Sequence, residues 1–500
     1  MSAGQVRTGE RPKVVVVGGG FGGVAAVQKL RKADVDVLLV DRHVYNMFQP
    51  LLYQVATAGL NPGDVTYFLR ALRYKQDNVN FRQGLLAKVD ADNQRITLKD
   101  GEEIDYDFLV LANGVTTNFL HTPGAKQHSR AIYTRSQALA IRDELFLHLE
   151  QAAASPEETD GLRVVIVGGG ATGVEMAGAL AELRNQGLTR AYPEIPKGHI
   201  EITLVQRGHE LIKPFAPKLR KYARNALDQR GVILRLGSGV KEVMADGVLL
   251  TDGTIVPADV VVWAAGVKAH DEVAAWGFEQ GWGGRIVVDD DMRVKGRSNV
   301  FAVGDIALSE SDLPQLAQPA LQSGKHAGAQ ILRILAGKPT QAFKYLDKGT
   351  MATIGRNAAV TQIPHLPGFT GWFAWYMWAG VHVFQLLGGR NRLSTFANLA
   401  SRYGQFWYDE PIPIIGEIRP VRLHGDRDPE PVTDDGPSAE AQAAPLADPA
   451  TASGPTSADD EQSRSDEQSR PDDHGHDDDQ SHAESTADAA SPAPSDPAAV

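Results

Sequence analysis

The sequence has 500 residues, of which 42% are hydrophobic and none is cysteine. A chain of this length can bury two or three domain cores. Without cysteine it cannot carry dithiol redox chemistry, cysteine-ligated iron–sulfur clusters or structural disulfides. The formal net charge of −12 is uneven, because residues 425–500 carry 20 acidic and 3 basic residues, whereas residues 1–424 carry 42 acidic and 47 basic ones.

These numbers predict a mildly basic folded body and an acidic tail. Residues 425–500 contain no Phe, Trp, Tyr or Ile, so they cannot bury enough apolar area to offset the entropy of ordering, and we expect them to be disordered. Three histidines among the aspartates of this tail fit a solvated tract better than a metal site, and no metal is predicted: His474, His476 and His482. The first 13 residues lack an apolar signal core, so we expect the body to stay on the cytoplasmic side.

A glycine-rich turn follows a run of valines near the N-terminus. Residues 13–23 read KVVVVGGGFGG, in which the β-branched run predicts a buried parallel strand and G-x-G-x-x-G predicts a turn into a helix. The first glycine of such a turn permits the bend, the second lets backbone approach a pyrophosphate, and the third lets helix pack on strand. Here they are Gly18, Gly20 and Gly23. A second predicted strand, residues 35–40, leads to Asp41, whose carboxylate we expect to bind a ribose.

The same pattern occurs again at residues 163–173, RVVIVGGGATG, where the glycines are Gly168, Gly170 and Gly173. The strand predicted to follow, residues 200–205, leads to Gln206 rather than to an acid. A neutral amide can bond a ribose hydroxyl, but it does not repel a 2′-phosphate, and Arg207 and His209 lie nearby. We therefore predict two dinucleotide sites, with NADH preferred at the second and NADPH not excluded.

Three later predicted strands are also followed by small or acidic residues. Residues 107–112 lead to Asn113-Gly114 and residues 260–263 lead to Ala-Ala-Gly, which again suggests duplicated architecture. Asp305 follows another short apolar strand. Its carboxylate can bond a polyol hydroxyl of a cofactor, or it can cap the helix that follows.

A helix is predicted from about Pro319, in the segment LAQPALQSGKHAGAQILRIL. Gln318 and Gln322 are four residues apart and therefore lie on roughly one face. Paired amides at a helix start can hold a ligand that carries a carbonyl group. On spacing alone, two surface glutamines are the favoured interpretation.

Residues 371–388 read GWFAWYMWAGVHVFQLLG. The run is close to the ~20 residues that span a bilayer, but it is short, rich in aromatics and interrupted by glycines. Trp and Tyr favour the headgroup boundary, and Arg390 and Arg392 can meet anionic phosphates. We expect an interfacial membrane anchor, with a buried core helix and a single span as alternatives.

Together, these motifs resemble those of the type II NADH:quinone oxidoreductases, single-chain respiratory enzymes that do not pump protons. Residues 46–57, NMFQPLLYQVAT, look like the flavin-side segment of that family. Residues 317–322 match its A-Q-x-A-x-Q motif, and residues 348–356 are similar to its K-G-x-M-A-x-I-G-R segment. The resemblance covers residues 13 to about 410. Gln206 replaces the usual acid and Asn113 the usual Thr, while the acidic tail has no counterpart.

The resemblance implies that NADH passes a hydride to FAD and that a quinone is then reduced to quinol. FAD would bind noncovalently through Gly18, Gly20, Gly23, Asp41 and Asp305, and NADH through Gly168, Gly170, Gly173 and Gln206. Gln318 and Gln322 would bind a quinone carbonyl. Glu175, expected in the first turn of the second nucleotide helix, and Lys348 would supply protons or stabilise charge.

The implied fold is α/β, with two Rossmann-like dinucleotide-binding domains of the glutathione-reductase type. We expect an FAD domain over residues 1–120 and 285–345, an NAD(P)H domain over residues 121–284, and a membrane-associating region over residues 346–424. The expected partners are a quinone, with menaquinone as one candidate, a lipid surface and a second copy in a homodimer, but no nucleic acid. The protein would be peripheral, or monotopic, at the cytoplasmic face of the cell membrane.

Two other functions fit part of the sequence. One is a soluble reductase of a protein acceptor such as ferredoxin, and the other is a non-catalytic, flavin-bound redox sensor. Disulfide reductases and sulfide:quinone oxidoreductases share the double nucleotide motif but need redox cysteines, which this chain lacks.

Overall fold

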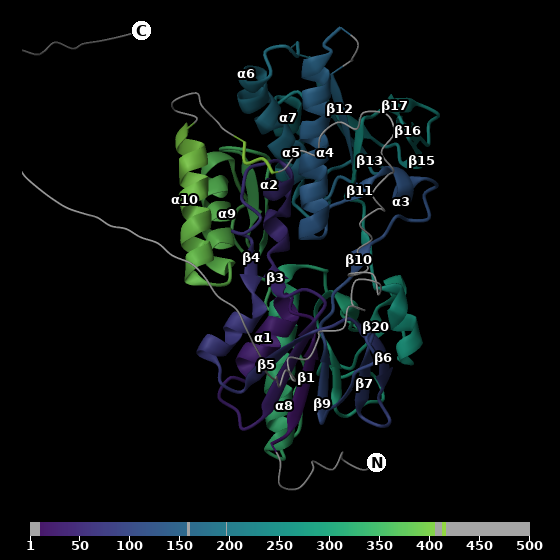
Figure 1. The fold of residues 1–500 in the computed structure, drawn as a ribbon, viewed down its shortest axis with the longest axis vertical. Helices are drawn as coiled ribbons and strands as arrows, with labels where there is room; N and C mark the ends of the chain where they lie inside the picture. The colour runs from purple at the N-terminus through teal and green to yellow at the C-terminus, as the bar shows by residue number, and fades with distance from the viewer. Residues whose placement is uncertain (1–10, 158–160, 197, 406–412, 417–500) are drawn as a thin grey trace, which may run out of the picture. The chain divides into compact units, whose positions relative to one another are not determined.

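The computed structural model describes residues 11–157, 161–196, 198–405 and 413–416. These residues belong to one compact unit, and Figure 1 shows its elements. The predicted acidic tail, residues 425–500, and its three histidines lie outside the described residues.

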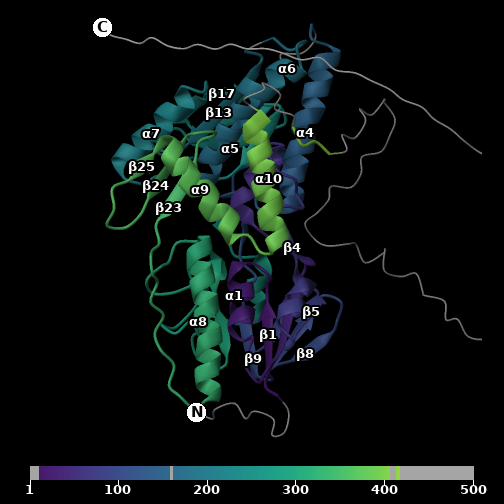
Figure 2. The same cartoon turned by 90° about the vertical axis from the view of Figure 1, so that its left-hand side faces the viewer.

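The first sheet consists of parallel strands on either side of the strand that precedes the first glycine turn. Its order is β21 (Val300–Ala302), β9 (Phe108–Leu111), β1 (Lys13–Val17), β2 (Asp36–Asp41) and β5 (Val79–Gln83). Helix α1 (Phe21–Lys29) follows β1, and α8 (Ala317–Leu335) lies beside it (Figure 2). Gly324 permits this close packing, because a Cβ there would lie 2.0 Å from the carbonyl oxygen of Gly22.

The second sheet repeats this arrangement. Its order is β11 (Arg130–Ala131), β18 (Val260–Trp263), β12 (Leu162–Val167), β13 (Ile200–Gln206) and β14 (Ile233–Leu236), again all parallel. The helices of this region include α4 (Arg135–Ala154), α5 (Ala171–Glu182) and α7 (Pro217–Asp228). The prediction of an α/β fold with two Rossmann-like sheets is therefore confirmed, and the predicted strands agree with these bounds to within one or two residues. The proposed division into domains stays a prediction.

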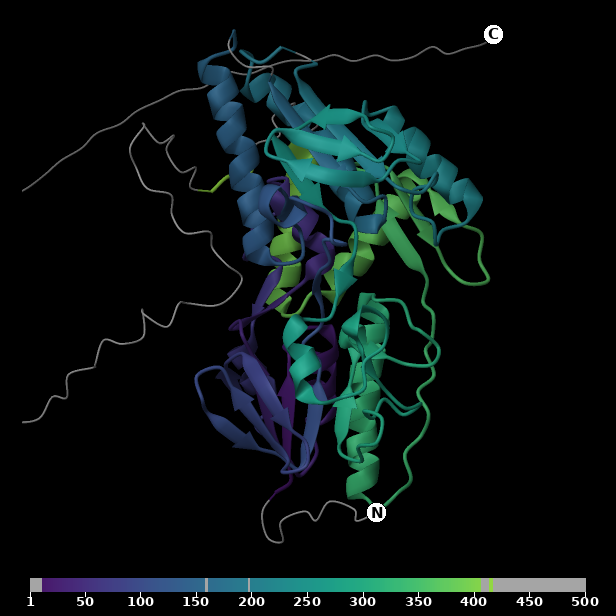
Figure 3. The same cartoon turned by 90° about the vertical axis from the view of Figure 1, so that its right-hand side faces the viewer.

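Smaller sheets accompany the two main sheets (Figure 3). β10 (Thr116–Thr117) pairs with β19 (Val267–Lys268), so the two chain segments that follow β9 and β18 run side by side. The other small sheets are β6 (Leu86–Asp90), β7 (Arg95–Leu98) and β8 (Glu103–Asp105); β15 (Val240–Met244), β16 (Gly247–Leu250) and β17 (Ile255–Pro257); β3 (Tyr45–Met47) and β4 (Thr66–Phe68); and β20 (Ile286–Val287) and β22 (Ala307–Leu308). Short helices include α2 (Leu52–Ala56), α3 (Ala125–His128) and α6 (Thr189–Ala191).

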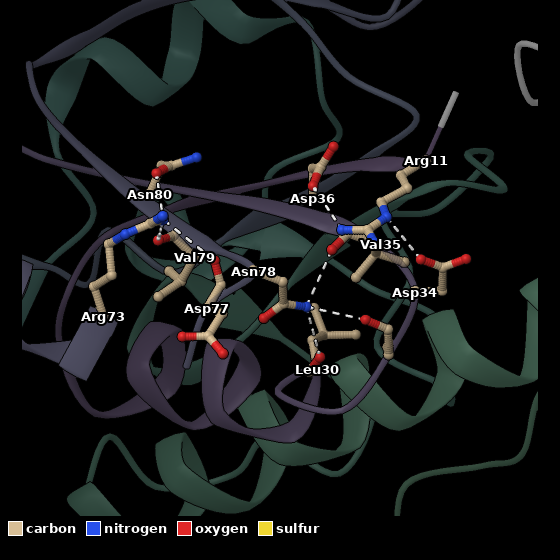
Figure 4. Close-up of polar contacts among 11 residues, drawn as sticks. Arg11, Leu30, Asp34, Val35, Asp36, Arg73, Asp77, Asn78, Val79 and Asn80 are labelled. Carbon is tan, nitrogen blue, oxygen red and sulfur yellow. Dashed lines mark hydrogen bonds and ion pairs between the residues drawn. The ribbon is translucent and has the colours of Figure 1, made fainter. Parts of the chain in front are cut away.

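Polar side chains hold the connection from α1 to β2 in place (Figure 4). The side-chain amide of Asn78 donates to the carbonyl oxygens of Leu30, Ala33 and Val35 at 3.2, 3.1 and 3.0 Å. Arg11 pairs with Asp34 at 2.8 Å on the exposed side of the same connection. Because β2 ends at the first nucleotide turn, these bonds help to fix the strand that carries its acid.

The region after α8 has its own small sheet and two helices. The antiparallel strands β23 (Thr350–Thr353), β24 (Ala359–Gln362) and β25 (Phe369–Thr370) lead into α9 (Gly371–Gln385) and α10 (Gly389–Gln405). No helix in the described part of the chain is both long and apolar enough to cross a bilayer. Residues 371–388 therefore do not form the single span that the sequence left open.

Candidate functional site

Both glycine turns require glycine at their first position. Gly18 and Gly168 have φ values of +106° and +116°, where any side chain is strained. A Cβ would also lie 2.2 Å from the carbonyl oxygen of Ala112 in the first turn and 2.5 Å from that of Ala264 in the second. Each turn thus packs against the residue that follows the neighbouring strand, β9 or β18.

The second glycine of each turn faces open space. Gly20 and Gly170 are extended residues at the N-caps of α1 and α5, and neither helix has a side-chain cap. A Cβ at either position would meet no atom within 4 Å, whereas a Cβ at Gly23 or Gly173 would lie 1.7 or 1.8 Å from the carbonyl oxygen of the first glycine of its turn. Each helix therefore presents uncapped backbone N–H groups to a space that fits a pyrophosphate.

The residue at the end of the second strand makes the same bond in both turns. Asp41 Oδ2 accepts the N–H of Gly19 at 2.5 Å, and Gln206 Oε1 accepts the N–H of Gly169 at 2.9 Å. Asp41 Oδ1 also accepts the N–H of His43 at 2.7 Å. Burial raises the pKa of Asp41, although these two backbone donors favour its charged form. The amide of Gln206 therefore replaces the acid in holding the turn, but it brings no negative charge.

Asp305 follows β21 of the first sheet and caps no helix. It sits inside a short 3₁₀ helix, Gly304–Ile306, and the helix that follows, α8, has Leu316 at its N-cap and no side-chain cap, so the capping alternative is wrong. The N–H of Gly304 donates to Ser323 Oγ on α8 at 3.0 Å, and the Tyr133 hydroxyl donates to Asp305 Oδ2 at 3.5 Å. Burial raises the pKa of Asp305 to about 6. Tyr133 was missed, because nothing in the sequence brings it to a residue 172 positions away.

Asn113, one of the two departures from the family pattern, also lies at the first turn. Its backbone nitrogen would be 2.7 Å from a Cβ at Gly18. Its buried Oδ1 has no hydrogen-bond partner within the described residues. Buried polar atoms are almost always paired. This acceptor therefore fits a bound group that carries a hydrogen-bond donor, at the same place where the glycine turn and Asp41 fit a nucleotide.

Glu175 is the fifth residue of α5, so the prediction that it lies in the first turn is wrong. Its side chain is buried, and its Oε1 accepts the N–H of Thr353, the last residue of β23, at 3.4 Å. Burial raises the pKa of Glu175 to about 8, against the opposing effects of the Thr353 N–H and the Trp378 indole. At neutral pH this carboxyl group therefore holds its proton and can release it, which suits a proton donor.

The two predicted glutamines have different surroundings. Gln318, the second residue of α8, donates from Nε2 to Gln385 Oε1 on α9 at 3.2 Å. Gln322 donates to the carbonyl oxygen of Leu346 at 2.9 Å and accepts its N–H at 3.0 Å. Both ends of the Gln322 amide are therefore bonded to Leu346. They hold the chain segment that leads from Leu346 to Lys348, which we call the strap. Lys348 is exposed, whereas Glu175 is buried, and Lys348 is not among the groups that shift the pKa of Glu175.

His382 and Gln385 were not assigned to the site from the sequence, although both are polar and lie three apart in an apolar run. Burial lowers the pKa of His382 to about 4, so its ring is neutral near pH 7. Its Nδ1 lies 2.8 Å from the carbonyl oxygen of Trp378 and must carry the ring proton, which leaves Nε2 as an acceptor. Polar residues at helical spacing within an aromatic segment were the signal that could have found them.

A row of rings joins the first nucleotide turn to the surroundings of Glu175. Phe21, the first residue of α1, meets Phe48 at 5.5 Å between ring centroids, and Phe48 meets His382 at 6.1 Å. His382 in turn stacks on Trp378 at 4.5 Å. Ring contacts thus connect the start of α1 to α9, the helix whose Gln385 accepts a hydrogen bond from Gln318 of α8 and whose Trp378 indole favours the charged form of Glu175.

Comparisons with known proteins agree with this geometry. A family model described as pyridine nucleotide-disulphide oxidoreductase matches residues 12–324, and one described as NDH2 C-terminal domain matches residues 348–403. A type II NADH:quinone oxidoreductase of Mycobacterium tuberculosis is 33% identical over 430 residues, which cover 81% of this chain and 92% of that protein. One from Staphylococcus aureus is 31% identical over 371 residues, 71% of this chain and 90% of that protein.

Solved structures share the fold. NDH2 of Plasmodium falciparum, in complex with NADH, has a TM-score of 0.74 at 19% identity and covers 80% of this chain and 99% of its own. The sulfide:quinone oxidoreductase of Aquifex aeolicus has a TM-score of 0.64 at 20% identity, with 79% and 95% covered. The matches to the curated relatives and to both family models show that this chain belongs to the type II NADH:quinone oxidoreductase family.

Proposed function

We propose that this protein oxidises NADH and reduces a membrane quinone to quinol without pumping protons. The observation that carries the proposal is that α9 links the first nucleotide turn, through the contacts of Phe21, Phe48 and His382, to Gln318, through Gln385, and to the buried Glu175, through Trp378. Bound FAD would supply the redox chemistry, accepting a hydride from NADH and passing two electrons to the quinone. The chain supplies binding, orientation and protons.

The two turns divide the nucleotides between them. We assign FAD to Gly18, Gly20, Gly23, Asp41 and Asp305, because the acid of the first turn and the carboxyl group after β21 both lie beside it. We assign NADH to Gly168, Gly170, Gly173 and Gln206. Since Gln206 holds its turn without a negative charge, NADPH is rejected less strongly there than at a turn with an acid.

The quinone site lies between the start of α8 and α9. Gln318 and the neutral His382 can form hydrogen bonds to the two states of a quinone oxygen, the amide N–H to a carbonyl and the imidazole Nε2 to a hydroxyl. Gln322 acts by holding Leu346, and through it the strap that carries Lys348. Glu175 supplies a proton as quinol forms, and Lys348 stabilises charge at the mouth of the site. Menaquinone is one candidate substrate.

One face of α9 and α10 suits a lipid surface. The exposed side chains of these helices include large apolar ones: Trp372, Phe373, Tyr376, Phe384, Leu393 and Phe396. Arg390 and Arg392 lie on the same pair of helices and can meet anionic headgroups. We propose a peripheral protein at the cytoplasmic face of the membrane, assembled as a homodimer. Trp375 and Trp378, which the sequence placed in the anchor, are buried and belong to the core.

Half-reactions measured separately test the site assignment. In Gln318→Ala and Gln322→Ala, NADH should still bleach the flavin band at the wild-type rate, while reoxidation by a short-chain quinone should slow by about tenfold, the effect of one lost hydrogen bond. Gln318→Ala should mainly weaken quinone binding, whereas Gln322→Ala should act by loosening the strap. Equal losses in both half-reactions would contradict the assignment.

A further inference from the structure

Trp378 is a fully buried tryptophan whose polar atom lacks a partner. It lies in the middle of α9 with 0% of its surface exposed, stacked on His382 and 6.3 Å from the ring of Tyr53. Its indole Nε1 makes no hydrogen bond within the described part of the chain. A buried N–H without an acceptor is costly, so we expect an acceptor for this N–H in some state of the protein.

Glu175, in contrast, is an acceptor with few donors around it. A carboxylate can accept about four hydrogen bonds, yet among the described residues Glu175 accepts one, from the Thr353 N–H at the long distance of 3.4 Å. The indole of Trp378 lies near enough to favour the charged form of this group. The hydrogen bond from this donor is weaker to the neutral acid than to the carboxylate. A buried carboxylate is costly without such a bond.

We propose that Trp378 is a positioning residue for Glu175, whose carboxylate accepts a hydrogen bond from the indole N–H once the acid has given up its proton. This inference rests on the proposed function of Glu175 as a proton donor. The O–H bond of Glu175 breaks, its electron pair stays on the carboxylate, and the proton forms a new O–H bond on the two-electron-reduced quinone. A proton from solvent then restores the acid.

The consequence is that one helix serves two purposes. Its outer face carries exposed aromatic side chains, and its inner face sets how tightly the buried acid of α5 holds a proton. The two faces follow from helical spacing, since Trp375 and Trp378 lie one turn apart on the buried side, while Trp372 and Tyr376 are exposed.

Among the described residues, no other titratable side chain is found to donate a hydrogen bond to Glu175. His382 is neutral and its Nδ1 proton is directed at the Trp378 carbonyl oxygen. Glu182, further along α5, pairs with Arg402 of α10 at 3.2 Å. The remaining groups around this core are Tyr53 of α2 and Tyr403 of α10, whose pKa values are raised by burial, and Arg356 after β23.

The substitution Trp378→Phe removes the N–H and keeps an aromatic ring. We expect the pKa of Glu175 to rise in this variant, so the decline of quinone turnover at alkaline pH should move upward by about one pH unit, as for the loss of one bond to a charged group. Infrared difference spectra provide a direct readout, because the C=O band of the protonated acid should persist to a correspondingly higher pH. That band is identified by its absence in Glu175→Gln.

Trp375→Phe is the matched control. Trp375 lies one turn earlier on α9, is 6% exposed and also has an unpartnered Nε1, but it packs on Tyr403 at 4.6 Å rather than beside Glu175. It should keep the wild-type pH profile and the wild-type infrared titration. If Trp378→Phe fails to fold, β-(3-benzothienyl)alanine at position 378 replaces the N–H by sulfur at nearly constant shape.

An upward shift confined to position 378 supports the proposal. Equal shifts in both variants, no shift in either, or a downward shift at position 378 would overturn it. If Glu175→Gln reduced quinone at the wild-type rate, the proposed function of Glu175 would fail, while the infrared titration would still decide whether Trp378 contacts it.

Discussion

The two nucleotide turns are nearly the same in backbone but differ in what their helices carry. In both, the first glycine has a positive φ, the second faces open space and the third touches the first. Eight residues after the first strand, α1 has Ala25 where α5 has Glu175. Helix α1 packs on α8, whereas α5 packs against β23. The shared pattern binds nucleotides, and the differences between the copies mark where the two sites have distinct tasks.

The largest expected effect comes from removing the acid that only the second helix has. Glu175→Gln should slow quinone reduction by about 10²–10⁴-fold, the usual contribution of a general acid, and leave bleaching by NADH unchanged. Stopped-flow absorbance separates these steps. Loss of both steps would mean that Glu175 belongs to the nucleotide site. In that case α5 would serve nucleotide binding alone, as α1 does.

The same variant changes how stability depends on pH. Burial raises the pKa of Glu175 from its ordinary value of 4.5 to about 8, so between these values the unfolded chain has released a proton that the folded protein keeps. Stability contributed by this group is therefore lost as pH rises through that window. Between pH 6 and 9, urea unfolding should show wild type losing roughly 3 kcal/mol relative to Glu175→Gln. Parallel pH profiles would contradict a raised pKa.

Alanine at the second glycine tests whether the two turns bind different nucleotides. Gly20→Ala and Gly170→Ala meet no protein atom within 4 Å, so both should fold. Each added methyl group occupies the pyrophosphate space and should weaken its own nucleotide by roughly 10–100-fold, the effect of a 1–3 kcal/mol steric penalty. Flavin retention on a desalting column should fall in the first variant only, and the KM for NADH should rise in the second only. The opposite pairing would reverse the assignment.

The exchange of acid for amide at the strand ends should have a smaller effect. Gln206→Glu keeps the oxygen that accepts the Gly169 N–H and adds a negative charge, so kcat/KM for NADPH should fall by about tenfold relative to NADH, equal to about 1.4 kcal/mol. Asp41→Asn is the reciprocal change and should leave this ratio unaltered. An unchanged ratio in Gln206→Glu would place the selectivity in another residue.

The smallest effect is expected at the exposed face of α9. Trp372→Ser combined with Phe384→Ser should weaken binding to anionic vesicles several-fold without changing the Glu175 pH profile, because these side chains are 63% and 73% exposed. Sedimentation with liposomes measures the binding. Undiminished binding would move the lipid contact to another surface.

The parts of the fold that depend on local pattern were predictable. Runs of β-branched residues and glycine turns located both sheets, and the positions of Gly18 and Gly168 followed from the bend that each turn requires. The equivalence of Asp41 and Gln206 was also expected from their place at the ends of β2 and β13, although the bond that they share was not.

The parts that depend on packing were not predictable. Whether Trp375 and Trp378 face lipid or core is decided by β24, β23 and α10, which pack against α9. The partners of Gln322 and Asp305 come from residues 24 and 172 positions away, and no local pattern reports such contacts. Glu175 could be singled out by resemblance, but its buried setting required the structure.

The most direct test of the central claim is a two-step stopped-flow experiment on the purified protein. NADH is mixed first and a short-chain quinone second, while the flavin absorbance is followed. We predict rapid bleaching by NADH and rapid recovery with quinone. Bleaching without recovery would contradict a quinone reductase, and an absence of bleaching would contradict the assignment of the two nucleotide sites.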